Sequence, residues 1–93
     1  MRIPIHPGEL LKEELDARSM SASGLAKCLG VDAPRINDII RCKRRITADT
    51  ALRLAQYFEN SAEFWLNLQM RHDLAMAKKE LGAKIKKEVR SAA

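Results

Sequence analysis

Apolar residues recur along this chain at the three- and four-residue spacing of helices that bury one face. No stretch alternates with the two-residue period of a strand. The pattern predicts an all-α protein of five helices. They cover residues 8–18, residues 22–29, a short segment that begins after Asp32, residues 48–58, and a long segment that starts at Ala62 and extends toward or past residue 78.

Residues that start and stop helices punctuate these segments. Candidate N-caps are Ser21, Asp32, Thr47 and Ser61. Pro34 falls in the first turn of the third helix, where no amide donor is missed. Gly30 supplies a left-handed residue that ends the second helix, and Gly82 predicts a break in the fifth. We therefore expect one domain over residues 1–80 and a basic, frayed tail over residues 81–93.

The apolar positions also indicate which face of each helix is buried. Inward positions are expected at Leu11 and Leu15, at Leu25, Ala26 and Leu29, at Ile36, Ile39 and Ile40, and at Leu52, Ala55 and Phe58. On the third helix the opposite face carries Pro34, Asp38 and Arg41, with Arg35 and Asn37 on its flanks. These side chains are the ones available to a partner.

The placement of charge narrows the class of partner. Of the net charge of +5 over 93 residues, residues 20–46 and 71–93 carry +4 each, whereas residues 47–70 carry −2. A basic surface placed in this way indicates a polyanionic partner. No window holds the roughly 20 apolar residues that cross a bilayer. Because residues 1–10 also lack the apolar run of a signal peptide, we expect a cytoplasmic protein with no membrane partner.

Motifs for catalysis or metal binding do not emerge from the sequence. His6 and His72 have no partner at metal-ligand spacing, and the serines near residue 20 lack a nucleophile elbow. Cys28 and Cys42 stand outside any metal-binding pattern and are expected to be structural thiols. We expect neither an enzyme nor a bound cofactor or metal.

The stretch over residues 21–45 has the order of a helix-turn-helix: cap, apolar pair, glycine turn, second cap and isoleucine stripe. Ser21 and Ser23 can contact a phosphate together with the free amides of the second helix. Arg35 can form the bidentate pair with guanine, and Asn37 can pair with adenine or a phosphate. Asp38 can accept from cytosine, but we expect it instead to orient Arg35 or Arg41, because phosphates repel a bare carboxylate.

A cluster of cations follows the isoleucine stripe. Its members are Arg41, Lys43, Arg44 and Arg45. We expect them to clamp the sugar-phosphate backbone, with each neutralised phosphate adding close to one unit to the salt dependence of binding. Taken alone, such a cluster is more often a solvated surface. The ordered motif in front of it favours double-stranded DNA as the ligand.

The fifth helix begins with a large apolar group for so small a protein. Phe64, Trp65, Leu68 and His72 follow one another at helical spacing. Packing in the core is the simpler interpretation. A homodimer interface is the alternative, because two-fold pairing doubles the area that a small domain buries on DNA. Both can hold, since the helix has two apolar flanks.

Three blocks of sequence, spread over residues 5–75, resemble the HigA/VapI-type antitoxins within the Cro and phage-repressor-like helix-turn-helix family. They are HPGE at residues 6–9, ITADTALRLA at residues 46–55 and SAEFWLNLQ at residues 61–69. The chain departs from that pattern at Gly24, where relatives carry glutamate, and at Cys42, which replaces a turn glycine. Asn60 is expected to take the left-handed position of another lost glycine. Ala33 and Pro34 occupy base-reading positions, where they can contact only a thymine methyl group.

The resemblance implies a lambda-repressor-like domain, with helices two and three as the helix-turn-helix and an extended C-terminal helix. It also implies an antitoxin that neutralises an mRNA-cleaving toxin of the HigB type and represses its own operon as a homodimer on operator DNA. Two alternatives remain open at this point. The chain can be mainly a toxin-binding protein with weak DNA binding, or a free-standing transcriptional regulator without a toxin partner.

Overall fold

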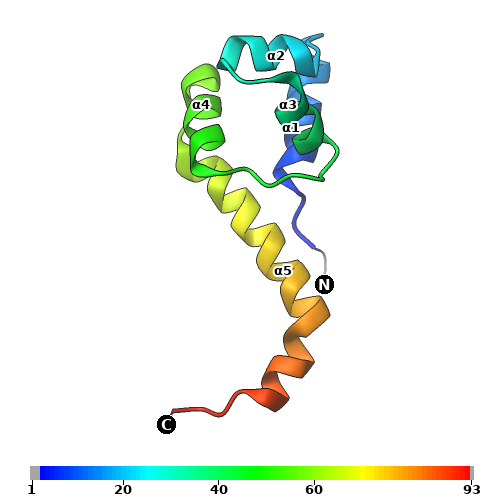
Figure 1. Ribbon diagram of the computed structural model, residues 1–93, viewed down its shortest axis with the longest axis vertical. Helices are drawn as coiled ribbons and strands as arrows, with labels where there is room; N and C mark the ends of the chain where they lie inside the picture. Colours follow the sequence, from blue (N-terminus) through cyan, green and yellow to red (C-terminus); the bar gives the residue numbers. More distant parts are fainter. Residues whose placement is uncertain (1–2, 93) are drawn as a thin grey trace.

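The five expected helices are all present within residues 3–92, the part of the chain that the computed structural model describes (Figure 1). They are α1 (Pro7–Ala17), α2 (Ala22–Leu29), α3 (Ala33–Ile40), α4 (Ala48–Phe58) and α5 (Ala62–Glu88). Residues 1–2 and 93, which the expected domain and tail included, lie outside the described part. The all-α fold class is confirmed, and the boundaries of α2 and α4 match the expected ones.

Helix α1 begins with a reciprocal cap formed by His6 and Glu9, which we did not predict from the sequence. The backbone amide of Gly8 donates to Nδ1 of His6 at 2.9 Å. The amide of His6 donates in turn to a carboxylate oxygen of Glu9 at 3.0 Å. Two amide groups that lack partners within the helix are thereby satisfied. Because Nδ1 of His6 accepts a hydrogen bond, the capping form of this ring carries no proton on that nitrogen.

Helices α1 to α4 and the first turns of α5 surround one hydrophobic core. It consists of Leu11, Leu15, Leu25, Ala26, Leu29, Ile36, Ile39, Ile46, Ala51, Leu54 and Trp65. In Figure 1, α2 spans the space between α4 on one side and α1 with α3 on the other. The expected inward position of Leu52 is wrong, because this side chain is 63% exposed. The buried stripe of α4 runs instead through Thr50, Ala51 and Leu54.

Backbone packing between α1 and α3 depends on a missing side chain. A Cβ atom at Gly8 would collide with the carbonyl oxygen of Ile39. Glycine at this position therefore allows the first turn of α1 to approach the end of α3. This approach packs α3 against the amino end of α1.

At two turns where members of the resembled family carry glycine, a residue other than glycine adopts the left-handed conformation. Cys42, which stands in for a turn glycine, has left-handed backbone with a φ of 61°. After α4 the left-handed residue is Glu59, with a φ of 56°, and not Asn60 as expected. Asn60 has a different task, because its side-chain oxygen accepts a hydrogen bond from Nε1 of Trp65 at 3.0 Å.

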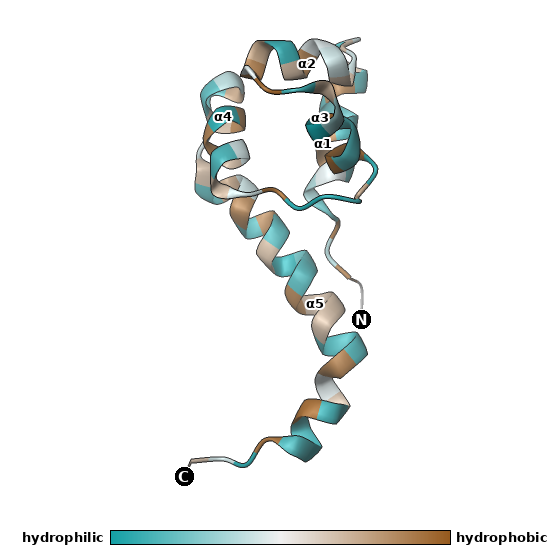
Figure 2. Ribbon diagram, in the orientation of Figure 1, coloured by the Kyte–Doolittle hydropathy of each residue, from teal (hydrophilic) through white to brown (hydrophobic). Residues whose placement is uncertain are grey.

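The break expected at Gly82 is absent, and α5 continues through it to Glu88. Good helix formers surround the glycine, so its cost of about 1 kcal/mol is tolerated. With 27 residues the helix is roughly 40 Å long. It gives the molecule its 50 Å extent in one direction against 21 Å in the other two. Figure 2 shows hydrophobic and hydrophilic residues alternating along its projecting half, residues 77–88, in which every residue except Gly82 is exposed.

The segment before α1 runs beside α5 and is attached to it through a histidine pair. Nδ1 of His72 lies 2.8 Å from the carbonyl oxygen of Pro4. The rings of His6 and His72 meet edge to face, with their centroids 5.1 Å apart. Burial and the neighbouring His72 lower the pKa of His6, although the nearby Asp73 and Glu9 partly oppose this shift.

The lowered pKa of His6 predicts a loss of stability in mild acid. Below about pH 6.5 the unfolded chain binds a proton at His6 that the folded chain resists, so the free energy of unfolding should decrease as the pH falls. The variant His6→Asn keeps an oxygen that can cap α1 but has no titrating ring, and it should show a flatter pH dependence. Urea unfolding between about pH 5 and pH 8 measures this. An unchanged slope in His6→Asn would contradict the assignment. His72→Asn removes one of the two causes of the lowered pKa of His6, so it should flatten the slope only in part.

Candidate nucleic-acid interface

Helix α3 presents a polar side to solvent because its isoleucines are used in the core. Ile36 and Ile39 are fully buried, whereas Pro34 and Arg41 are exposed and Asp38 is partly exposed. The polar face predicted for this helix is therefore confirmed. Since α2 packs against α3 across a tight turn, the two helices form the expected helix-turn-helix.

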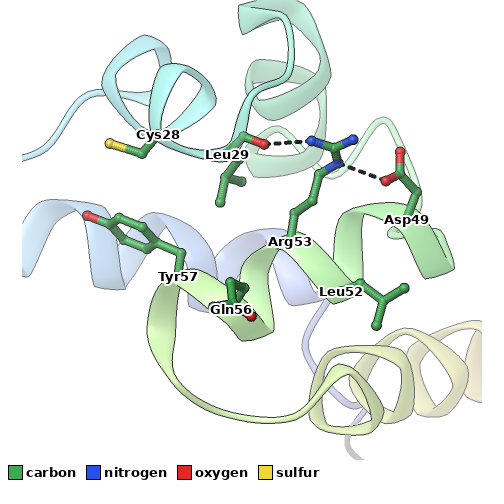
Figure 3. A pocket seen from close by; sticks show the side chains of 7 residues that line it. All are labelled: Cys28, Leu29, Asp49, Leu52, Arg53, Gln56 and Tyr57. Carbon is green, nitrogen blue, oxygen red and sulfur yellow. Dashed lines mark hydrogen bonds and ion pairs between the residues drawn. The ribbon is translucent and has the colours of Figure 1, made fainter.

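The guanidinium group of Arg35 is the end point of a relay of hydrogen bonds across three helices. Nη1 of Arg53 donates to the carbonyl oxygen of Leu29, at the end of α2, at 2.8 Å. Nε of Arg53 donates to one carboxylate oxygen of Asp49 at 2.7 Å, as Figure 3 shows. The other oxygen of Asp49 accepts from Nη1 of Arg35 at 2.9 Å. These bonds from Arg53 and Arg35 lower the pKa of the Asp49 carboxyl, which stays ionised at neutral pH.

The expected role of Asp38 as a holder of Arg35 or Arg41 is wrong. Its carboxylate lies 3.7 Å from Nη2 of Arg44, which belongs to the loop after α3. The left-handed turn at Cys42 changes the direction of the chain there. A cation six residues away in sequence thereby reaches Asp38, and the two neighbours one helical turn away do not pair with it.

Asn37 is partly engaged within its own helix. Its Nδ2 group donates to the carbonyl oxygen of Ala33 at 3.2 Å. The side-chain oxygen of Asn37 keeps its capacity to accept. Ala33 itself is partly buried and Pro34 is exposed, so the first turn of α3 offers little side-chain hydrogen bonding apart from Arg35.

The cations after α3 fall into two groups. Arg44 pairs with Asp38, and Nη2 of Arg45 lies 2.8 Å from Oδ2 of Asp73. The second contact is an ion pair without hydrogen-bond alignment. Arg41 and Lys43, in contrast, are exposed and form no ion pair with any residue from 3 to 92. Arg41 and Lys43 can therefore bind an anion such as a phosphate without breaking an existing ion pair.

Helix N-termini add backbone donors to the same region. Ser21 caps α2 by accepting from the amide of Gly24 at 2.9 Å, and Ser23 is exposed beside it. Asp32 and Thr47 occupy the N-cap positions of α3 and α4, but their side chains form no capping hydrogen bond. Arg35, Arg44, Arg45, Thr47, Asp49 and Thr50 line one hollow at the start of α4. Amides and cations thus converge there, as at an anion-binding surface.

A buried glutamine on α5 anchors the loop that carries the cations. Oε1 of Gln69 accepts a hydrogen bond from the amide of Ile46 at 2.8 Å. Nε2 of Gln69 donates to Oδ1 of Asp73 at 2.9 Å, and Asp73 in turn pairs with Arg45. We did not predict this role from the sequence. The signal was present, because Gln69 stands one helical turn after Trp65, on the side of α5 that faces the core.

The side chains expected at a dimer interface on α5 have unlike surroundings. Trp65 is 1% exposed and belongs to the core, so it has no surface to offer a second copy of the chain. Phe64 is 42% exposed, while Leu68 and His72 are partly buried. The four residues are therefore not one surface.

The described structure also shows the state of the cysteines and of possible metal-ligating groups. Among residues 3–92 no three histidine, cysteine or acidic side chains gather as metal ligands. Cys28 and Cys42 are exposed free thiols. The helices within the same range are too short or too polar to span a bilayer.

Comparison with known proteins decides the family. The helix-turn-helix family model matches residues 11–65. Virulence-associated protein I of Dichelobacter nodosus is 54% identical over 77 residues, which make up 82% of this chain and 71% of that protein. An addiction module antidote protein of the HigA family from Coxiella burnetii is 53% identical, with a TM-score of 0.91 over 97% of this chain and 99% of that one. The chain belongs to the HigA-type antitoxins of the helix-turn-helix family.

The similarity to HigA-type antitoxins includes the long last helix. The Pseudomonas aeruginosa antitoxin HigA, solved with the higBA promoter, is 46% identical, with a TM-score of 0.91 over 97% of this chain and 99% of that one. Matches of this extent cover the projecting half of α5 as well as the helix-turn-helix. The HigA-type resemblance found in the sequence is thereby confirmed.

Proposed function

We propose that this chain acts in the cytoplasm as an antitoxin that represses its own operon. It binds operator DNA as a homodimer and neutralises an mRNA-cleaving toxin of the HigB type. The observation that carries the DNA-binding part is the convergence at the helix-turn-helix of the unpaired Arg41 and Lys43, the helix N-termini and the oriented Arg35. The solved promoter complex of the related HigA supports it.

On DNA, α3 enters the major groove with its first turn toward the base edges. Arg35 then donates to a guanine, while Ala33 and Pro34 can contact thymine methyl groups. Arg41 and Lys43 bind phosphates on one side, and Ser21 with Ser23 bind phosphates on the other. Asn37 and the paired Arg44 and Arg45 contribute where they exchange an internal partner for DNA. Readout depends mainly on one arginine, and positioning depends on many phosphate contacts.

Single alanine variants separate readout from positioning. Arg35→Ala should weaken operator binding by about 1–3 kcal/mol and leave binding to unrelated DNA nearly unchanged. Lys43→Ala should weaken binding to every sequence and reduce the slope of log K against log salt by about one unit. Fluorescence anisotropy on the promoter duplex of its own operon and on a scrambled duplex measures both, with Lys79→Ala on α5 as the control. Operator affinity that survives both changes together would refute the groove assignment.

The dimer is proposed to form through one exposed face of α5, from Met70 to Ile85. Met70, Leu74, Leu81 and Ile85 are spaced to share one face of the helix, and each is 44–55% exposed. An isolated helical segment of this length is only marginally stable in water. A second copy of the chain, lying along the same stripe, covers these side chains and stabilises the helix. This face differs from the one that carries Phe64 and His72.

Charge introduced into the stripe should separate the dimer. Leu81→Lys places an ammonium group in the proposed interface and is expected to give a monomer in sedimentation equilibrium. Ala83→Lys adds the same charge on another face of α5 and should remain a dimer. Circular dichroism establishes that both variants stay helical. A helical Leu81→Lys variant that still sediments as a dimer would exclude this face, and dissociation by Phe64→Lys would point to the first turn of α5 instead.

The toxin partner is tested with the product of the neighbouring gene. When the two are expressed together, a tag on this chain should retain the neighbour, and the complex should no longer cleave mRNA in a translation extract. Arg35→Ala serves as the control, because it should bind the operator more weakly and still retain the toxin. If the neighbouring gene product does not bind this chain and does not cleave RNA, the chain is a free-standing regulator.

A further inference from the structure

We propose that Asp49 is a positioning residue for sequence recognition, which presets the guanidinium group of Arg35 before DNA arrives. This inference rests on the proposed operator binding and adds a residue that makes no base contact of its own. Asp49 belongs to the first turn of α4, fourteen positions from Arg35 in sequence. The two residues lie on either side of the loop that joins α3 to α4, and Gln69 holds that loop through the amide of Ile46.

The relay behind Asp49 is fixed at its far end by backbone. The carbonyl group of Leu29 lies in the last turn of α2, where no amide of the same helix is available to it. Arg53 satisfies this carbonyl with one nitrogen and holds Asp49 with another (Figure 3). Arg53 therefore fixes the carboxylate of Asp49 through one oxygen, and the other oxygen accepts the hydrogen bond from Arg35. The position of the reading arginine is set by α2 and α4 together.

The contact leaves Arg35 able to read DNA. Asp49 occupies one of the five N–H donors of the guanidinium group, through Nη1. The side chain of Arg35 is 29% exposed, so part of its surface still faces solvent. A bidentate contact to guanine needs two donors, which the remaining four can supply.

A carboxylate so close to a DNA-binding surface also needs a reason to be there. Phosphates repel a bare carboxylate, so Asp49 alone would weaken binding to any duplex. Between Arg35 and Arg53 its charge is more than balanced, because the cluster carries one net positive charge. An arginine loses rotamer freedom when it docks on a base, and a preset arginine loses less. The benefit of Asp49 therefore appears only where Arg35 meets its correct base pair.

The test is a double-mutant cycle between Asp49→Asn and Arg35→Ala, measured on the promoter duplex and on the scrambled duplex. Asp49→Asn should weaken promoter binding by about three- to tenfold, the cost of ordering one long side chain. Binding to the scrambled duplex should stay the same or tighten slightly, since a negative charge is removed. In the Arg35→Ala background, Asp49→Asn should have no further effect on the preference for the promoter. Asp49→Glu, which keeps the charge, should retain more of that preference than the asparagine variant.

Each other outcome overturns the inference. Equal tightening on both duplexes would mean that Asp49 only repels phosphate. Equal weakening on both, with a lower melting temperature than the surface control Asp16→Asn, would mean that Asp49 only supports the fold. If the wild type prefers the promoter and Arg35→Ala leaves that preference intact, Arg35 reads no base and there is nothing for Asp49 to position. If the wild type shows no preference for the promoter at all, the proposed function itself fails.

Discussion

The hydrogen bond from the amide of Ile46 to the buried side chain of Gln69 joins the two halves of this molecule. Ile46 belongs to the loop that follows α3, and Gln69 belongs to α5, the helix that extends away from the others. A buried amide left without its partner costs about 1–3 kcal/mol, so the loop is strongly held in this position. Asp73 extends the attachment to Arg45. This cluster therefore links the surface around α3 directly to α5.

Local rules of helix formation explain why most of the fold is legible in the sequence. Ser21 and Ser61 cap as expected, and the isoleucines of α3 fill the core at the expected spacing. The errors at two positions have different causes. Glu59 takes the left-handed turn because Asn60 is used by Trp65. Gly82 fails to end α5 because nothing after it offers a better structure than continuing the helix.

In the candidate site, too, local features were predictable from the sequence and contacts between elements were not. The order of cap, turn, stripe and cations predicted which residues gather at the helix-turn-helix. That order did not predict the ion-pair partners of these residues. Arg45 pairs with Asp73 on α5, and Arg35 pairs with Asp49 across the loop between α3 and α4. Asp38 shows the limit most clearly, since its true partner is reached through a turn rather than along the helix. Spacing along one helix is readable from sequence, whereas contacts between elements need the fold.

The continuous helix α5 fixes the distance and the angle between the parts of the molecule at its two ends. Its first turns are fixed to the loop after α3, and the stripe proposed to meet a second copy runs from Met70 to Ile85 along the same unbroken helix. Each residue added to or removed from the middle of this helix would turn the two halves by about 100° and shift them by about 1.5 Å. In the proposed dimer the length of α5 would therefore determine which operators place their half-sites correctly. Insertions and deletions in α5 should accordingly alter the spacing and phase of recognised half-sites without touching any residue that contacts DNA.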